Sequence, residues 1–149
     1  MRLTLAHIGS RAPAGDEFDR LTGEYLKRVN AWYACEAASF RSEDGLLAWL
    51  DRRPARTTPV VALLDSRGRQ MTSEAFASWL GSRRDQGAQH IVFAVGPASG
   101  WSQDARARAQ LLLSLGSLTL AHALARLVLA EQLYRACTIL AGHPYHSGH

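Results

Sequence analysis

The sequence predicts an α/β fold with a mainly parallel sheet flanked by helices. Short apolar segments, typical of buried strands, alternate along the chain with longer segments whose apolar residues recur at helical spacing. The strand segments at residues 59–65 and 89–95 are apolar at most positions, as expected when helices cover both faces of a sheet. With 149 residues, the chain is expected to form a single domain.

The first part of the chain predicts two strands and two helices. Apolar residues alternate over Arg2–Ile8 and predict the first strand. A helix is expected from Asp16, because acidic residues suit the positive end of a helix and apolar residues then recur at helical spacing. A second strand is expected at residues 33–40 and a short helix at residues 43–52.

The middle of the chain continues the alternation. A third strand is expected at residues 59–65, closed by a turn at residues 66–69. Thr72 or Ser73 is expected to cap a helix that runs to about residue 86. A fourth strand at residues 89–95, a loop at residues 96–100 and a short helix at residues 102–110 follow.

The last segment, residues 111–149, contains only three formally charged residues, Arg126, Glu131 and Arg135. A fifth strand is expected within residues 111–120, and the last helix over residues 123–140. A helix that is apolar on nearly every side must be covered on nearly every side. One face can cover the sheet, so a homodimer with twofold symmetry is expected to bury the other.

The composition of the chain indicates which kinds of partner and which compartment suit it. The net charge is +4, and all basic residues except Lys27 are arginine, which suits contacts with RNA phosphates and bases. An Ala- and Arg-rich composition typical of a GC-rich genome explains the same numbers equally well. Cys35 and Cys137 have no metal-ligand spacing and are expected to be free thiols. No signal peptide or membrane span is expected, so the sequence predicts a cytoplasmic protein.

Several polar residues interrupt the apolar last segment. His122 and Arg126 are four residues apart on one helix face, and Arg126 is expected to hold a phosphate or a carboxylate. His122 has both a structural and a functional interpretation. Glu131 and Arg135 are expected to form an internal ion pair. Although histidines follow at 143, 146 and 149, no carboxylate or thiolate lies near them in the sequence, so no metal site is expected.

The residues also carry a family resemblance. Three stretches contribute besides the opening MRLTLAHIG: VALLDSRG at residues 61–68, VGPASG at residues 95–100, and LxLGSLTLAHxLxRLxLxEQLYRAxxI followed by HPYH. Together they resemble the SPOUT methyltransferases called ribosomal RNA large subunit methyltransferase H, over the whole chain. The resemblance implies a SPOUT-type fold with a C-terminal trefoil knot. It also implies methyl transfer from S-adenosyl-L-methionine to N3 of a pseudouridine in 23S rRNA of the assembled ribosome.

The same resemblance implies the cofactor-binding residues: Leu64, Gly96, Leu115, Gly116, Ser117, Leu118, Thr119 and Leu120. The chain departs from the family at Pro97, Ala98 and Ser99, where a glycine, a proline and a glutamate are usual, and at Ala121, usually proline. The glycines of this loop are expected to permit a positive φ or the approach of a ligand. Without the resemblance, the loop is an ordinary turn and residues 115–120 are a core strand.

Without the resemblance, residues 143–149 are expected to be a flexible tail. The resemblance implies instead that Tyr145 and His146 close over the substrate, from their own or from the partner subunit. His146 is expected to handle the proton of N3, since histidine titrates near neutral pH. Tyr145 is expected to contact the base, and Arg126 to hold a phosphate, with Arg135 as a weaker candidate. Two alternatives remain open: a SPOUT methyltransferase of another RNA such as tRNA, and a catalytically silent, dimeric RNA-binding protein.

Overall fold

Every strand pairing of the sheet is parallel, which confirms the predicted fold class. The computed structural model describes residues 1–147, and its five strands lie in the order β2-β1-β4-β3-β5. Their bounds are Arg2–Ile8 for β1, Ala34–Phe40 for β2, Val60–Gln70 for β3, His90–Val95 for β4 and Leu111–Ser114 for β5. Strands β1 and β4 are buried at nearly every position, so both faces of the sheet must be covered there.

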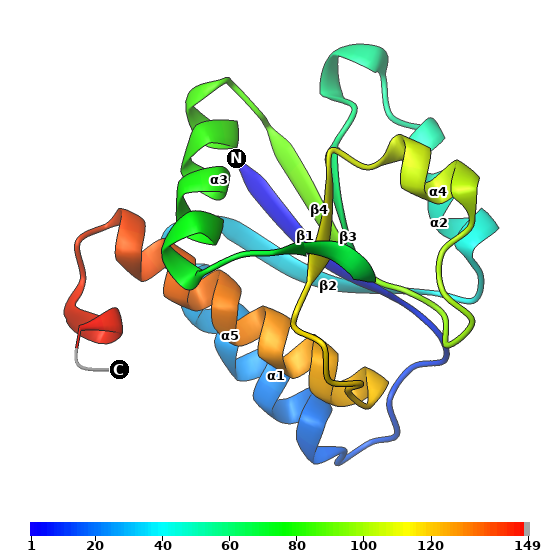
Figure 1. Ribbon diagram of the computed structural model, residues 1–149, viewed down its shortest axis with the longest axis horizontal. Coiled ribbons are helices and arrows are strands. Elements are labelled where there is room, and N and C mark those ends of the chain that lie inside the picture. The colour runs from blue at the N-terminus through cyan, green and yellow to red at the C-terminus, as the bar shows by residue number, and fades with distance from the viewer. Residues whose placement is uncertain (148–149) are drawn as a thin grey trace.

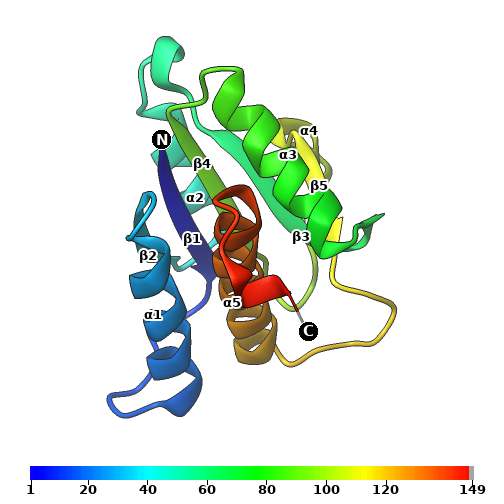
Figure 2. The ribbon, with the colours of Figure 1, turned by 90° about the vertical axis from the view of Figure 1, so that its left-hand side faces the viewer.

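Helices cover both faces, as Figures 1 and 2 show. The helices are α1 (Glu17–Val29), α2 (Glu43–Asp51), α3 (Ser73–Asp85), α4 (Gln103–Arg108) and α5 (His122–Leu140), with 3-10 turns at Ala55–Thr57 and Pro144–His146. One core contains Phe93 of the sheet with residues of α1, α3 and α5. The other contains the neighbouring Val92 with residues of α2 and α4. Successive side chains of β4 therefore enter opposite cores, as strand geometry requires.

Side-chain caps fix the starts of four helices. Asp16, Ser42, Thr72 and Ser102 each accept a hydrogen bond from the backbone N–H three residues further along. The prediction that Thr72 or Ser73 caps α3 is thereby confirmed, with Thr72 as the cap. Helix α5 has no such bond, because Ala121 stands at its N-cap.

The turn expected at residues 66–69 is wrong. Strand β3 continues to Gln70 and pairs with β5 through a register shift between Leu64 and Arg69. Gly68 makes this approach possible, because a Cβ at that position would lie 2.5 Å from the backbone of Leu112. The apolar pattern of residues 59–65 could not reveal the extension, since it depends on contact with a strand much further along the chain.

The core-strand interpretation of residues 115–120 is also wrong. Strand β5 ends at Ser114, and the chain then leaves the sheet as an irregular loop. Gly116 has a φ of +132°, a value that strongly favours glycine. Leu118 is 83% exposed, so this leucine cannot be a core residue of the isolated chain.

The last helix is unevenly covered. Leu129, Leu133 and Ala136 are fully buried against the sheet side, whereas Leu124 and Leu127 are only half-buried.

Within residues 1–147, no helix has the length and apolarity that crossing a membrane requires.

Candidate active site

A cavity of about 790 Å³, the large cavity, lies beyond the C-terminal ends of β4 and β5 and beside residues 64–67 of β3, where the pairing with β5 shifts register. Ligands of parallel α/β sheets bind at this edge. All eight predicted cofactor residues line it: Leu64, Gly96, Leu115, Gly116, Ser117, Leu118, Thr119 and Leu120. They come from three segments, distant in the sequence, that the fold brings to one cavity; their role in binding a cofactor stays a prediction.

Trp101 forms the packed side of the glycine loop. Its indole Nε1 donates a hydrogen bond to the carbonyl oxygen of Leu64 over 2.8 Å. A Cβ at Gly96 would lie 2.6 Å from Cε2 of this indole, and Gly96 does not have a positive φ. The expected positive φ at Gly96 is therefore wrong, and Trp101 crowds this position, whereas the approach of a ligand to Gly96 stays a prediction. Gly100 has a φ of +85° and confirms the expectation for the second glycine.

His122 connects the last helix to the same loop. Its Nε2 lies 2.8 Å from the carbonyl oxygen of Gly96, so this nitrogen carries the proton and donates it. The ring also meets the ring of His7 edge to face, with centroids 5.9 Å apart. His122 lines the large cavity, which shows that its structural bond and a place in the candidate site are compatible.

Asp65, Arg67 and Arg106 provide the charged part of the lining. The Asp65 carboxylate accepts from Nε of Arg106 over 2.7 Å and from the backbone N–H of Arg67 over 2.9 Å. Burial alone would raise the pKa of Asp65, but these hydrogen bonds outweigh burial and hold the pKa below its usual value. Asp65 is thus ionised at neutral pH. Its position after an apolar strand was visible in the sequence, whereas its pairing with Arg106 was not.

Arg126 does not line the large cavity. It is only 7% exposed and lies between α1 and α5, where Nη2 reaches a carboxylate oxygen of Asp19 at 3.4 Å. Its buried Nε has no hydrogen-bond partner among the described residues. The neighbouring His7 has a lowered pKa, chiefly because it is buried and also because Arg126 and His122 lie nearby.

The tail that carries Tyr145 and His146 lies at the opposite end of α5 from the large cavity (Figure 1). The Tyr145 hydroxyl donates to Glu131 over 3.0 Å, and Glu131 pairs with Arg135 over 2.7 Å, which confirms that ion pair. Arg135 donates to Nδ1 of His146 over 2.9 Å, so the proton of a neutral His146 is on Nε2. That nitrogen lies 2.7 Å from Oε1 of Glu74. Within one chain, neither tail residue reaches the cofactor residues.

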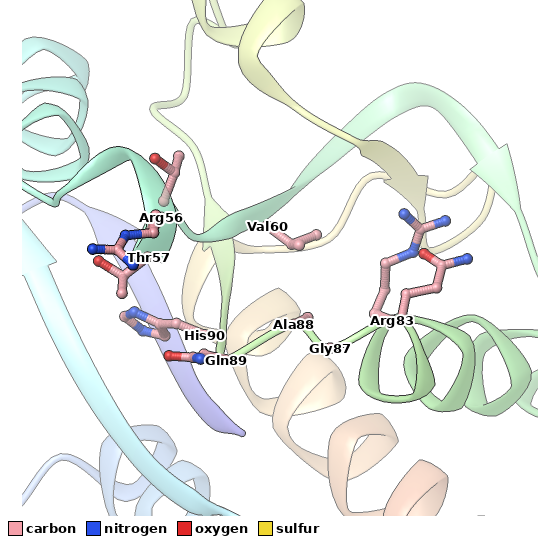
Figure 3. Close-up of a pocket in the computed structure, with 10 residues that line it drawn as sticks. Arg56, Thr57, Val60, Arg83, Gly87, Ala88, Gln89 and His90 are labelled. Atoms are coloured by element: carbon pink, nitrogen blue, oxygen red, sulfur yellow. The ribbon is translucent and has the colours of Figure 1, made fainter.

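A second, small cavity of about 230 Å³ lies at the other edge of the sheet, before β3 and β4. Figure 3 shows Arg56 and Arg83 at opposite ends of it, so the two guanidinium groups do not point to a common centre. His90, at the start of β4, contributes to its wall.

Among residues 1–147, no three His, Cys, Asp or Glu side chains gather in a way that could hold a metal ion. His149, the third histidine considered for such a site, lies outside the described residues.

Comparisons with known proteins agree with this architecture. Residues 1–146 match the family described as predicted SPOUT methyltransferase. The chain is 49% identical over 149 residues to the ribosomal RNA large subunit methyltransferase H of Koribacter versatilis, covering 100% of both chains. It is 40% identical over 153 residues to the protein of the same name from Rhodospirillum centenum, covering 98% of this chain and 99% of the relative.

A solved structure supports the fold. The SpoU methyltransferase AviRb from Streptomyces viridochromogenes, in complex with the cofactor AdoMet, superposes with a TM-score of 0.53 at 11% identity. The match covers 92% of this chain and 60% of AviRb. The parallel sheet, the three loops gathered at its edge and the full-length similarity lead to one conclusion: the chain belongs to the SPOUT methyltransferases known as ribosomal RNA large subunit methyltransferase H.

Proposed function

We propose that the protein is a cytoplasmic homodimer that methylates N3 of a pseudouridine in 23S rRNA, with S-adenosyl-L-methionine as the methyl donor. The observation that carries the proposal is the convergence of Leu64, Gly96 and residues 115–120 on one cavity. Two findings support it: relatives of nearly equal length are rRNA methyltransferases, and AviRb was solved with AdoMet. The trefoil knot of the family stays a prediction.

The lining of the large cavity suits the donor. Leu115, Leu118 and Leu120 offer apolar surface to an adenine ring, and backbone groups of this loop can bind the ring edge. When bound, the donor supplies a methyl group attached to a positively charged sulfonium sulfur. Transfer of the methyl group to N3 would turn the sulfonium into a neutral thioether, which is the leaving group. The chain must therefore hold the methyl carbon and N3 in line and accept the N3 proton.

The residues for the second task come from the tail. Tyr145 contacts the base, and His146 receives the N3 proton on Nδ1 after this nitrogen has left its bond with Arg135. Arg126 lies on α5 and not in the tail; it is buried and pairs with Asp19, so it holds the carboxylate and not the phosphate of its two expected partners. The partly uncovered side of α5 and the exposed Phe18 and Leu21 on α1 favour a second copy at this face. In such a dimer, the tail of one subunit reaches the large cavity of the other, which the tail of its own chain does not reach.

The proposed chemistry is tested by titrating S-adenosyl-L-methionine into the protein in a calorimeter and mapping rRNA methylation in a deletion strain. We expect binding, and loss of one methylated pseudouridine from 23S rRNA in the deletion strain. No binding at millimolar donor would favour the silent RNA-binding protein. A methyl group lost from tRNA, with rRNA unchanged, would favour the alternative substrate.

Subunit exchange tests the shared site. Gly116→Val places a side chain on the cavity loop where a Cβ meets nothing within 4 Å, so it perturbs the loop and not the core. Homodimers of Gly116→Val and of His146→Ala should each be inactive. Mixing the two chains should restore activity, because in a heterodimer the intact cavity of one chain meets the intact tail of the other. A mixture as inactive as its parents, or a monomer by light scattering at micromolar concentration, would contradict the model of a shared site.

The substrate is the assembled ribosome. With a net charge of +4, this domain has little positive surface for selecting one nucleotide of free RNA. Methylation of ribosomes should therefore be much faster than methylation of protein-free rRNA. Equal rates on both substrates would contradict this part of the proposal.

A further inference from the structure

Charge is confined to a small part of the large cavity. Its lining contains three formally charged side chains, Asp65, Arg67 and Arg106, while the leucines of the loop after β5 are apolar. The three charges lie together: Arg106 is 2.7 Å from Asp65, and Nε of Arg67 is 4.0 Å from the same carboxylate. The cavity therefore suits a ligand with one charged end and one apolar, aromatic end.

We propose that Asp65 and Arg106 recognise the amino-acid end of the methyl donor, Asp65 through its α-ammonium and Arg106 through its α-carboxylate. This inference rests on the proposed function, because it assigns a role to residues at the same site. It adds two recognition residues to those that the family resemblance implies.

Both side chains keep hydrogen-bonding capacity for a ligand. Arginine has five N–H donors, and the bonds of Arg106 use Nε toward Asp65 and Nη1 toward Gln103, the latter at 3.5 Å. Nη2 takes no part in either bond. Each oxygen of Asp65 accepts one of the bonds from Arg67 and Arg106, and a carboxylate oxygen has a second lone pair.

The burial of the pair favours this assignment. The Asp65 side chain is 5% exposed and that of Arg106 is 21% exposed, so a ligand that covers them removes their remaining water. The two charges stay paired with each other, but Nη2 of Arg106 and the second lone pairs of Asp65 would lose their water, so a ligand that covers them should offer an acceptor to Arg106 and a donor to Asp65. The amino-acid end of the methyl donor carries one charge of each sign, whereas its nucleoside part carries neither.

Two ligands that differ only at this end provide the test. S-adenosylhomocysteine and methylthioadenosine share the nucleoside and a neutral thioether, but only the first has the amino-acid end. Their dissociation constants would be measured by calorimetry for the wild type, Arg106→Gln, Asp65→Asn and Arg108→Gln. Arg108 is the matched control, because it lies on the same helix and pairs with Asp51 and does not line the cavity. Thermal melts would confirm that each variant is folded.

We expect Arg106→Gln and Asp65→Asn each to raise the dissociation constant of S-adenosylhomocysteine by about 10- to 100-fold, the effect of losing a charged hydrogen bond. Their affinity for methylthioadenosine, and both affinities of Arg108→Gln, should stay at the wild-type value. Equal losses for both ligands would overturn the inference, because the pair would then serve the nucleoside or the fold. Unchanged affinities would also overturn it. Wild-type protein that binds neither ligand would instead overturn the proposed function.

Discussion

The C-terminal and N-terminal edges of the sheet carry similar residues, histidine and arginine, but these residues have different roles at the two edges. At the C-terminal edge, the large cavity of about 790 Å³ is bounded by irregular loops, with the buried His7 close by. At the N-terminal edge, the small cavity of about 230 Å³ is bounded by the short connections that lead into β3 and β4, with the buried His90 in its wall (Figure 3). Both edges carry arginines.

The difference lies in what holds the polar groups. Nε2 of His90 lies 2.8 Å from the Thr4 hydroxyl, and nearby the backbone N–H of Arg2 donates a hydrogen bond to the carbonyl oxygen of Gln89. These hydrogen bonds join the starts of strands β1 and β4. By contrast, Nδ1 of the buried His7 has no hydrogen-bond partner within the described residues. Arginine and histidine therefore do not mark a functional site by themselves. A buried polar atom without a partner does not mark one either, because Nε of Arg83 in the lining of the small cavity also has none among the described residues. The C-terminal ends of the parallel strands do.

The largest effect should appear on acidification at the N-terminal edge. Burial, with the positive charges of Arg2 and Arg53, lowers the pKa of His90 from 6.5 to about 4. The unfolded chain thus takes up this proton first. The contribution of His90 to stability is complete above pH 6.5 and is lost as the pH falls toward 4, by about 3 kcal/mol.

Urea unfolding of the wild type and of His90→Gln between pH 4 and pH 7 measures this contribution. The variant should show a shallower loss of the free energy of unfolding, with a remainder from His7, whose pKa is also lowered. Identical pH slopes for the two proteins would show that His90 is not the acid-sensitive group of this edge.

A glycine substitution at the C-terminal edge should affect both stability and binding. In Gly96→Ala the new methyl group must displace the Trp101 indole, which breaks its bond to Leu64. We expect a loss of about 1–3 kcal/mol in the free energy of unfolding, typical of overpacking, together with weaker binding of S-adenosyl-L-methionine. Adding Trp101→Leu should recover part of the stability. A Gly96→Ala protein as stable as the wild type would rule out this packing argument.

The smallest effect is expected from the matching glycine at the N-terminal edge. Gly87 has a φ of +90°, and a Cβ there would meet nothing within 4 Å. Gly87→Ala should therefore cost only the local strain of that backbone, roughly 1 kcal/mol. Donor affinity, measured by the same titration, should not change. A change in affinity would show that the two edges are coupled and would weaken the contrast between them.

Local patterns were enough to predict the elements but not their extensions. Helix starts depend on a side chain bonding three residues ahead, as at Thr72, so the sequence alone could reveal them. The second half of β3 depends on Gly68 meeting the backbone of Leu112, which no local pattern records. The eight cofactor residues came from family resemblance. The Asp65–Arg106 pair joins side chains 41 residues apart, so it became visible only in three dimensions.

The strand order has a consequence for how the chain reaches this structure. Strand β1 must pair with β4, and Thr4 meets His90 across 86 residues of sequence. Helix α1 packs against α5, where Asp19 and Arg126 are 107 residues apart. Contacts this distant form late, because the entropy of closing long loops is lost before the contacts can offset it. During translation, α1 therefore cannot complete its contacts before α5, the last helix, has been synthesised.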